Sequence, residues 1–487
     1  MTSATRIAIR RTTVFGTAAA LALAIAPHAS ATLDAKASTL KGSTILGTAA
    51  LAMAQTSAAL DAGAPGATLT ATSKTSAPSA ASTTAASSTT AAAAAAGRTV
   101  NVSTSAQLSS AVANAVPGDT ILLAGGTYTG KLSISRSGTA AAPITIKPAG
   151  TGAVVLTASV KMPSCNATGP DGDRTITFIK GASHWTISGL TVRNGVLISS
   201  KNASAAQNWF AARIKSGDWS ARRAIPGRGT NDPVAARTAL TRLSALTGQT
   251  IIPSDGIILT GNTITGKGVF GRSTRYGTLS GNTVTDIACG TGPAIWLSTF
   301  SDGWTISNNT VSKVASSSAS HYMQEGIRLG NASSYNKLSG NTVKDLPGIG
   351  RGITTDQDAS WNVIERNTTS GVDIGFNDQM SGWGNTWQHN TAASYRTAGF
   401  SFRIMDGPLP APSMDTSTNK AVVRCNTAVG IQDLQVGGAQ GVTFQSNSFN
   451  DVFLGKHLRT YFGAKGNTWN GSSAAPSTKP TASLSGC

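Results

Sequence analysis

Short stretches of alternating apolar and polar residues recur along the chain from Asp255 to Gly471. A two-residue alternation is the periodicity of a β-strand and not of a helix. The stretches are punctuated by a phrase of Asn, Thr and an apolar residue, as in Asn262-Thr263-Ile264 and Asn309-Thr310-Val311. Successive asparagines of this phrase are 20, 27, 32, 26, 23, 36, 21 and 20 residues apart. A spacing in the low twenties with occasional insertions is typical of a stacked solenoid.

Strands this short cannot bury an apolar face alone, so they must stack rung on rung, with their inward residues forming one core. The recurring asparagine is predicted to lie at a sharp turn, because Asn tolerates the left-handed backbone conformation. Its amide can also bond to the copy in the next rung. We therefore interpret the asparagine repeat as part of the scaffold and predict an all-β solenoid.

An amphipathic helix is predicted before the first rung. Residues 105–116 place Leu108, Val112 and Val116 on one helical face, with Ser105 as the N-cap. A Pro-Gly-Asp sequence then ends the helix. Because a solenoid has an open apolar end that must be covered, this helix is predicted to cap the N-terminal rung.

The segment from Leu108 to Gly150 contains Pro117-Gly118-Asp119-Thr120, Gly126-Thr127-Tyr128 and Pro143-Ile144-Thr145-Ile146. In these motifs it resembles the N-terminal cap and first rungs of secreted right-handed parallel β-helix proteins of the pectate-lyase-like superfamily. It is most similar to the chondroitinase B and alginate lyase group. The resemblance implies a right-handed parallel β-helix over residues 98–470. The family's catalytic lysine and arginine motifs, the Asp-Pro-His-Glu of mannuronan epimerases and the Gly-His-Gly of polygalacturonases are not matched, so no catalytic residue is transferred.

The N-terminal part of the chain has a different composition. Residues 1–31 combine a basic start, an apolar stretch and Ala29-Ser30-Ala31, which is the pattern of a secretory signal peptide. Residues 32–97 are predicted to be an Ala/Ser/Thr-rich disordered linker, because they bury too little apolar surface to offset ordering. Residues 471–487 form a C-terminal tail. No later apolar run is long enough to span a membrane, so a secreted protein without a membrane span is expected.

A helical insertion is predicted at residues 200–250, where the repeat is interrupted. Asp232-Pro233 begins a stretch with Leu240, Leu243 and Leu246 at helical spacing, and Gly248 ends it. The basic segment before it is either a flap beside a binding site or an insertion packed on the side of the solenoid. Its cationic and indole residues are Trp209, Arg213, Lys215, Trp219, Arg222, Arg223 and Arg228.

The chain contains four cysteines, Cys165, Cys289, Cys425 and Cys487. An even number in an exported chain suggests disulfides, for which three connectivities are possible. Their wide spacing argues against a zinc site. A bond that joins Cys487 to a late rung such as that of Cys425 is the simplest expectation.

Charged residues make up only 12% of the chain, yet the formal net charge is +18. The low charged fraction suits a turn-rich β architecture and argues against a helical bundle. A basic surface favours polyanions as partners, although a dispersed excess that only aids solubility is the alternative. No aromatic-basic nucleic-acid module is visible. We therefore expect a monomer that binds an acidic polysaccharide and no nucleic acid.

An alignment of the repeats on the glycine that opens each first strand predicts which residues face outward. The inward positions in this alignment are Ile257, Ile295, Ile327, Ile353, Val372, Phe400 and Ile431. Residues next to them must face outward, and outward side chains on successive rungs, about 4.8 Å apart, can touch. One outer face thus gathers Trp296, Glu325, Arg328, Arg351, Asp356, Asp373 and Arg403. Its flanking loops add His321, Tyr322, Asp358, Asn377 and Asp378.

Three functions fit this face, and a ladder of compensating surface ion pairs is the structural alternative. In β-elimination, a base removes the proton next to a uronate carboxylate while a cation neutralises that carboxylate; calcium held by Asp356, Asp358 and Asp373 could assist. In inverting glycoside hydrolysis, Asp356 and Asp373 would lie on adjacent rungs about 8 Å apart. Without chemistry, the same face would bind glycan on a secreted or cell-surface protein.

Lyase action on a uronate-containing polysaccharide is the preferred interpretation. The candidate catalytic residues are Glu325, Arg328, Arg351, Asp356 and Asp373. The candidate substrate-binding residues are Trp296, His321, Tyr322 and Arg403.

Overall fold

The computed structural model describes residues 97–165, 172–216, 225, 234–315, 324–379, 382–403, 420–437, 439–449, 452–454, 466–474 and 487. The predicted signal peptide and all but the last residue of the predicted linker lie outside the described residues. So do His321, Tyr322 and the part of the basic segment that contains Trp219, Arg222, Arg223 and Arg228.

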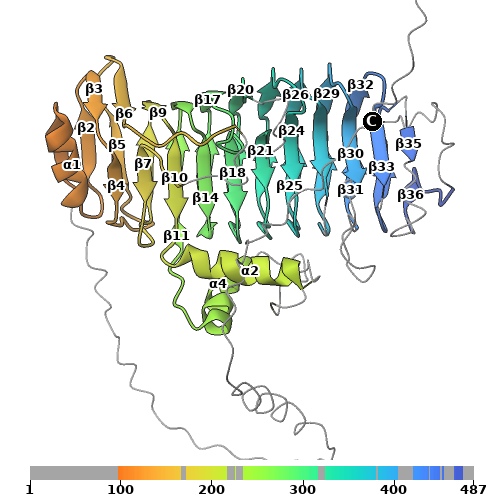
Figure 1. The fold of residues 1–487 in the computed structure, drawn as a ribbon, viewed down its shortest axis with the longest axis horizontal. Coiled ribbons are helices and arrows are strands. Elements are labelled where there is room, and N and C mark those ends of the chain that lie inside the picture. The colour runs from red at the N-terminus through yellow and green to blue at the C-terminus, as the bar shows by residue number, and fades with distance from the viewer. Residues whose placement is uncertain are drawn as a thin grey trace, which may run out of the picture. The chain divides into compact units, whose positions relative to one another are not determined.

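Three long parallel sheets form a right-handed parallel β-helix, as the sequence predicts (Figure 1). Sheet A contains β1 (Thr99–Val102), β2 (Thr120–Leu123), β5 (Ile144–Pro148), β8 (Trp185–Ser188), β12 (Ile258–Thr260), β16 (Thr278–Ser280), β19 (Thr305–Ser307), β22 (Lys337–Ser339), β25 (Val363–Glu365), β28 (Thr386–Gln388), β31 (Val422–Arg424), β34 (Thr443–Gln445) and β36 (Thr468–Trp469). Sheet B contains β3 (Gly126–Thr129), β6 (Val154–Thr157), β9 (Thr191–Arg193), β13 (Thr263–Gly266), β17 (Thr283–Ile287), β20 (Thr310–Ser312), β23 (Thr342–Lys344), β26 (Thr368–Ser370), β29 (Thr391–Ala393) and β32 (Thr427–Val429). Sheet C contains β4 (Leu132–Ile134), β7 (Ile176–Phe178), β10 (Val196–Ser199), β14 (Val269–Arg272), β18 (Ile295–Ser298), β21 (Glu325–Leu329), β24 (Arg351–Thr355), β27 (Ile374–Asp378), β30 (Ala398–Arg403), β33 (Leu434–Gly437) and β35 (Val452–Leu454). A short pair, β11 (Ser254–Asp255) and β15 (Thr274–Arg275), lies apart from them.

The inward residues of the three sheets form one continuous core. In sheet A, Leu259, Leu279 and Ile306 stand in register on successive rungs, and each is at most 1% exposed. Full burial of such a side chain contributes about 1.5–3 kcal/mol, so the stack as a whole, and no single rung, supplies the stability.

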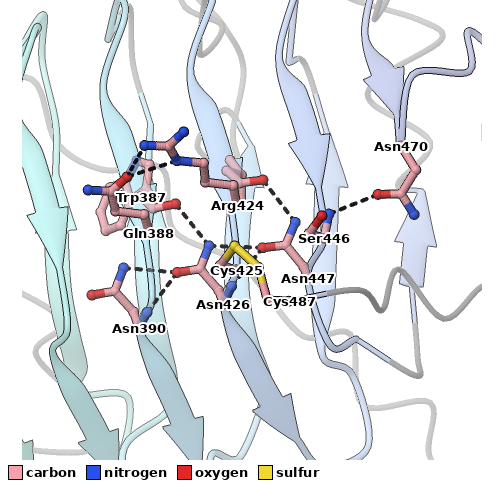
Figure 2. The surroundings of a disulfide bond; sticks show 11 residues. Trp387, Gln388, Asn390, Arg424, Cys425, Asn426, Ser446, Asn447, Asn470 and Cys487 are labelled. Carbon is pink, nitrogen blue, oxygen red and sulfur yellow. Dashed lines mark hydrogen bonds between the residues drawn. A yellow bond between two sulfur atoms is a disulfide. The ribbon is translucent and has the colours of Figure 1, made fainter.

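Buried asparagine side chains form a hydrogen-bonded ladder along the stack. The Asn309 amide donates to Asn341 Oδ1 and to the Leu279 carbonyl, at 2.9 Å each, and Asn309 Oδ1 accepts from the Asn282 amide. Figure 2 shows the same pattern from Asn390 through Asn426 to Asn447. The predicted bonding between rungs is therefore confirmed.

The predicted backbone conformation of these asparagines is wrong. The residue before each ladder asparagine takes the positive φ angle, for example Gly281 at 61° and Gly340 at 67°. Glycine has no Cβ to clash in this conformation, which explains why it so often precedes the Asn-Thr phrase.

The N-terminal rung is capped by helix α1 (Ser105–Ala113), which buries Leu108 and Val112. Its N-cap is Thr104 and not Ser105, because the Thr104 hydroxyl and the Gln107 side chain form a reciprocal capping box. The helix ends before Val116, which is 45% exposed.

The described part of the insertion contains helices α2 (Ala203–Lys215) and α4 (Val234–Thr247), which pack on each other beside the β-helix (Figure 1). Phe210, Leu240 and Leu243 form a small core with Phe300 and Ala332, which follow β18 and β21. This packing confirms an insertion packed on the side of the solenoid. A role as a flap stays a prediction.

Two disulfides tie distant parts of the chain together. One joins Cys425 to Cys487, as expected, and so fixes the last residue to the turn before β32 (Figure 2). The other joins Cys165 to Cys289, 124 residues apart in sequence. Disulfides of this kind persist in oxidising compartments.

The prediction that Asp378 lies in a flanking loop is wrong, because Asp378 is the last residue of β27 and lies inside the β-helix. It is fully buried, stands in register with Thr355 and Phe402, and its Oδ2 accepts hydrogen bonds from Trp387 Nε1 at 3.0 Å and Asn385 Nδ2 at 3.2 Å. Burial raises the pKa of this carboxyl from 3.8 to about 6, because the hydrogen bonds offset only part of the lost hydration.

The raised pKa makes stability depend on pH. The folded chain holds the Asp378 proton more tightly than the unfolded chain, so this group stabilises fully below about pH 4, and its contribution of about 3 kcal/mol is lost as the pH rises through 6. The Asp378→Asn variant is therefore expected to unfold at a higher denaturant concentration than the parent at pH 8. Its free energy of unfolding should also change less between pH 4 and pH 6. Urea unfolding followed by tryptophan fluorescence measures both; an unchanged slope would contradict the assignment.

Candidate functional site

The strand register of sheet C differs from the sequence-based alignment at three rungs. Thr354 of β24 stands opposite Asn377 of β27, whereas the alignment placed Asp373 there. Asp373 precedes β27, beside Gly350, so it lies about 20 Å along the strand direction from Asp356. The predicted pair of hydrolytic carboxylates is therefore wrong.

The other two differences concern the ends of the predicted face. The rung before β18 joins sheet C through β14, and not through the strand that follows Ile257 as the alignment had it. Phe270 and Arg272 therefore occupy the outward positions opposite Trp296 and Ser298. Near the C-terminus Leu434 takes the inward position opposite Phe400, and Ile431 is 84% exposed. Sequence reasoning missed Phe270 and Arg272, although Gly268 followed by an apolar residue repeats the motif used for the alignment.

A cluster of charged side chains lies on the outer face of β21 and β24, and we call it the Arg328 centre. It consists of Glu325, Arg328, Arg351 and Asp356. Arg328 Nη1 donates to Glu325 Oε1 at 2.9 Å, and its Nη2 donates to Asp356 Oδ2. Arg351 Nη1 is 3.8 Å from the same Glu325 oxygen. The sequence-based prediction brings these four residues together correctly.

The backbone at Gly326 explains how Glu325 and Arg328, three residues apart, can pair on a strand. A Cβ at Gly326 would approach Val343 Cγ1 of sheet B to 2.3 Å, so this residue faces the core. Ile327 is also buried in the core. Two successive inward positions bring the flanking side chains to the same outer face, which simple alternation would not do.

The Arg328 centre is buried, although its strand positions face outward. Glu325 is 2% exposed, Arg328 4% and Asp356 2%, whereas the Arg351 side chain is 29% exposed. Burial raises the pKa of Asp356 above its usual value, because the attraction of Arg328 does not offset the lost hydration and Glu325 adds repulsion. Each carboxylate has one oxygen bound to Arg328, while Glu325 Oε2 and Asp356 Oδ1 have no hydrogen-bond partner among the described residues.

Aromatic side chains continue the same outer face toward the N-terminus. Trp296 stacks on Phe270 with ring centroids 4.5 Å apart and an interplanar angle of 12°. The Arg328 guanidinium carbon lies 5.9 Å from the Trp296 ring centroid. Trp296 is therefore next to the charged cluster, as predicted.

Asp358 and Asp373 do not join this cluster. Asp358 lies in the buried turn after β24, and the Asp373 carboxylate accepts a hydrogen bond from Thr397 Oγ1 at 2.6 Å. Arg403 is the last residue of β30, in register with Gly437. The predicted calcium ligands Asp356, Asp358 and Asp373 thus do not come together, and no group of three or more His, Cys, Asp or Glu in the described ranges could hold a metal ion.

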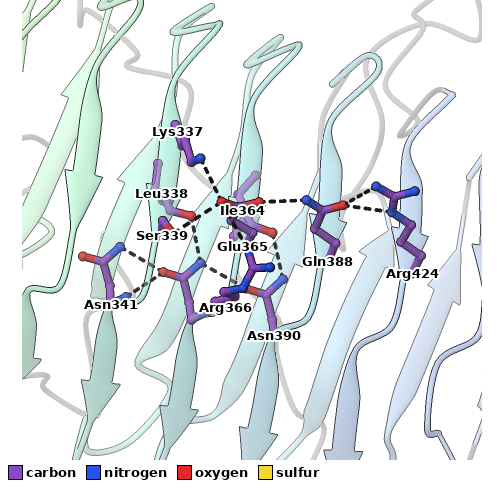
Figure 3. A network of polar contacts seen from close by, with 11 residues as sticks. Lys337, Leu338, Ser339, Asn341, Ile364, Glu365, Arg366, Gln388, Asn390 and Arg424 are labelled. Carbon is purple, nitrogen blue, oxygen red and sulfur yellow. Dashed lines mark hydrogen bonds and ion pairs between the residues drawn. The ribbon is translucent and has the colours of Figure 1, made fainter. Parts of the chain in front are cut away.

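A surface ion-pair ladder does exist, but on sheet A (Figure 3). Glu365 bonds Lys337 at 2.9 Å and the Gln388 amide at 2.8 Å, and Gln388 Oε1 accepts from Arg424. The hydrogen bond from Lys337 lowers the pKa of Glu365. Lys337 is 54% exposed, so solvent screens the pair. The Arg328 centre differs because it is desolvated.

Two family models match parts of the chain. The model described as Chondroitinase B matches residues 102–164, which contain the cap and first rungs. The resemblance stated from the sequence is thereby confirmed for this segment. The model described as Periplasmic copper-binding protein (NosD) matches residues 247–403, which contain the Arg328 centre. No curated protein sequence matches the chain.

Solved structures with similar folds include carbohydrate-active enzymes. An alginate lyase from Paenibacillus sp. str. FPU-7 is 17% identical, with 72% of this chain and 94% of that chain covered and a TM-score of 0.38. The GH136 lacto-N-biosidase from Eubacterium ramulus is 12% identical, with 73% of this chain and 60% of that chain covered and a TM-score of 0.40. The family 28 exopolygalacturonase from Yersinia enterocolitica is 12% identical, with 73% of this chain and 75% of that chain covered and a TM-score of 0.41. At this level of similarity, none of them assigns a reaction to this chain.

Proposed function

We propose that this protein is a secreted enzyme that cleaves a uronate-containing polysaccharide by β-elimination at the Arg328 centre. The observation that carries the proposal is the arrangement of its two carboxylates. Arg328 holds one oxygen of Glu325 and one of Asp356, and leaves the other oxygen of each without a hydrogen-bond partner among the described residues. Arg351, the most exposed member, is the cation that an anionic chain meets first.

Each step of the elimination has a candidate group. Arg351 binds the uronate carboxylate, which acidifies the neighbouring C5–H. Glu325 Oε2 takes that proton, the electron pair forms the C4–C5 double bond, and the C4–O bond breaks. Asp356, whose pKa is raised by burial, suits the transfer of a proton to the departing oxygen. Arg328 positions both carboxyl groups.

Charge and covalent structure agree with this function. The formal net charge of +18 attracts an acidic polymer. The two disulfides suit an oxidising compartment outside the cytoplasm. No described helix has the length and apolar character needed to cross a membrane. The match of residues 102–164 to chondroitinase B supports action on a polysaccharide.

Activity on a panel of acidic and neutral polysaccharides tests the proposal. Ultraviolet absorbance of the unsaturated uronate and new reducing ends are followed together. We expect both signals on an acidic polymer, and a loss of at least about a hundredfold in kcat/KM for Arg351→Met, Glu325→Gln and Asp356→Asn. Asp356 is hydrogen-bonded to Arg328, and the predicted calcium ligands lie apart. Removal of calcium with a chelator is therefore expected to leave activity unchanged.

Arg366→Met is the matched control, since Arg366 is a 64% exposed arginine directly after β25 of sheet A. It should retain activity. Reducing ends without absorbance would replace elimination by hydrolysis, with Glu325 and Asp356 as the carboxylate pair. Binding without either signal would leave a glycan-binding β-helix. Copper binding, named for the family that matches residues 247–403, gains no support from the described residues.

A further inference from the structure

Arg272 differs from Arg328 and Arg351 because no carboxylate pairs with it in the described part of the chain. Its Nη1 donates to Gln207 Oε1 of α2 at 3.3 Å, and its Nη2 donates to Ser199 Oγ at 3.4 Å. Both bonds are long and go to neutral acceptors. The buried Nε has no hydrogen-bond partner among the described residues. Desolvation lowers the pKa of Arg272, and no anion in the described structure offsets it.

The stacked aromatic pair connects this arginine to the Arg328 centre. The Arg272 guanidinium carbon lies 5.7 Å from the Phe270 ring centroid, and Phe270 stacks on Trp296, which contacts Arg328. The indole nitrogen of Trp296 is buried, and no described residue accepts a hydrogen bond from it. Two unpaired donors, Arg272 Nε–H and Trp296 Nε1–H, thus lie on adjacent rungs of the same outer face.

We propose that Arg272, Phe270 and Trp296 form a second subsite, which binds the carboxylate of another uronate in the same polysaccharide chain. The Nε–H and Nη2–H of Arg272 form the side-on fork that matches a carboxylate bidentately. The indole N–H supplies a further donor to the sugar. This inference rests on the proposed function, because it assigns the second contact of the same acidic substrate.

The strand register sets the distance between the two subsites. Arg272 stands opposite Ser298, and the next rungs place Gly330 and Asp356 at the same level. Three rung spacings separate Arg272 from Asp356, which corresponds to about 14 Å. A single sugar cannot reach both positions, so the ligand must be an oligosaccharide with repeated carboxylates.

Binding of uronate oligosaccharides of increasing length tests this inference. Titration calorimetry is carried out with oligomannuronates and oligogalacturonates in the Glu325→Gln background, which prevents turnover. Long oligomers should bind the parent more tightly than the disaccharide. Arg272→Met should weaken long oligomers by about tenfold to a hundredfold and leave the disaccharide unchanged. Arg272→Lys keeps the charge but lacks the fork, so its affinity for long oligomers should lie between those of the parent and Arg272→Met. It replaces the methionine variant if that variant does not fold.

Arg193→Met, at an exposed position on sheet B, controls for net charge. An equal loss in this control would assign the effect to general electrostatics and overturn the second subsite. Equal binding of long oligomers by the parent and Arg272→Met would also overturn it, while leaving the proposed function standing. If the parent binds neither series at any length, the proposed function itself fails.

Discussion

Arg328→Met is expected to lower the free energy of unfolding by about 3–5 kcal/mol at neutral pH. The Arg328 side chain is 4% exposed and pairs with Glu325 and Asp356, which are each 2% exposed. Without it, two carboxylates stay buried side by side, and the remaining described cation of the cluster, Arg351, is 3.8 Å from Glu325. The loss should appear in urea unfolding followed by tryptophan fluorescence.

The pH dependence of this loss identifies its cause. Burial raises the pKa of Asp356 and Arg328 opposes this, so without Arg328 the Asp356 carboxyl takes up a proton more readily at about pH 5 than at about pH 8, and the destabilisation should be smaller at the lower pH. Arg351→Met removes a cation from the same cluster, but from a 29% exposed position, and should cost about 1 kcal/mol or less. Equal losses of unfolding free energy in the two variants would mean that water reaches the cluster, and would contradict its burial in the structure.

Asn309→Ala is expected to lower the free energy of unfolding by about 3 kcal/mol or more, with no effect on the charged cluster. The change leaves the Asn282 backbone N–H, the Asn282 amide and the Leu279 carbonyl without their Asn309 partners. Each buried polar group left unpaired costs about 1–3 kcal/mol. Thermal or urea unfolding of the variant measures this loss.

Asn101→Ala is the control for that experiment, because Asn101 is an exposed asparagine on the first strand. It should change stability by less than about 0.5 kcal/mol. A loss at Asn309 no larger than at Asn101 would show that water replaces the ladder bonds and that the ladder contributes little.

Local patterns determined much of the scaffold. The two-residue alternation identified strands, because the inward residues of a half-buried strand are mostly apolar and alternate with outward, mostly polar ones. The Asn-Thr phrase predicted a bonded ladder, which the amides of Asn262 through Asn447 form. The cap helix and the Cys425–Cys487 bond also follow from local signals. The left-handed residue was misplaced by one position, because glycine and asparagine both favour that conformation.

The sequence also predicted that Glu325, Arg328, Arg351 and Asp356 lie together, since the aligned register of β21 and β24 is the register observed. It could not reveal that Gly326 turns inward, because that depends on Val343 of another sheet. Nor could it reveal that the cluster is buried, since strand alternation predicts only which side of a sheet a residue faces.

The strand register of sheet C was decided by the tertiary structure. Alignment on Gly371 instead of Gly375 shifts β27 by four residues, and because this number is even, Phe376 stays inward and Asn377 stays outward. The alternation therefore cannot detect it. Only the lengths of the corners and the packing of Phe376 against Phe400 select the observed register. For the same reason the sequence determined that this is a β-helix with a charged outer face, while the tertiary structure decided that Arg272, Phe270 and Asn377, and not Asp373, lie on it.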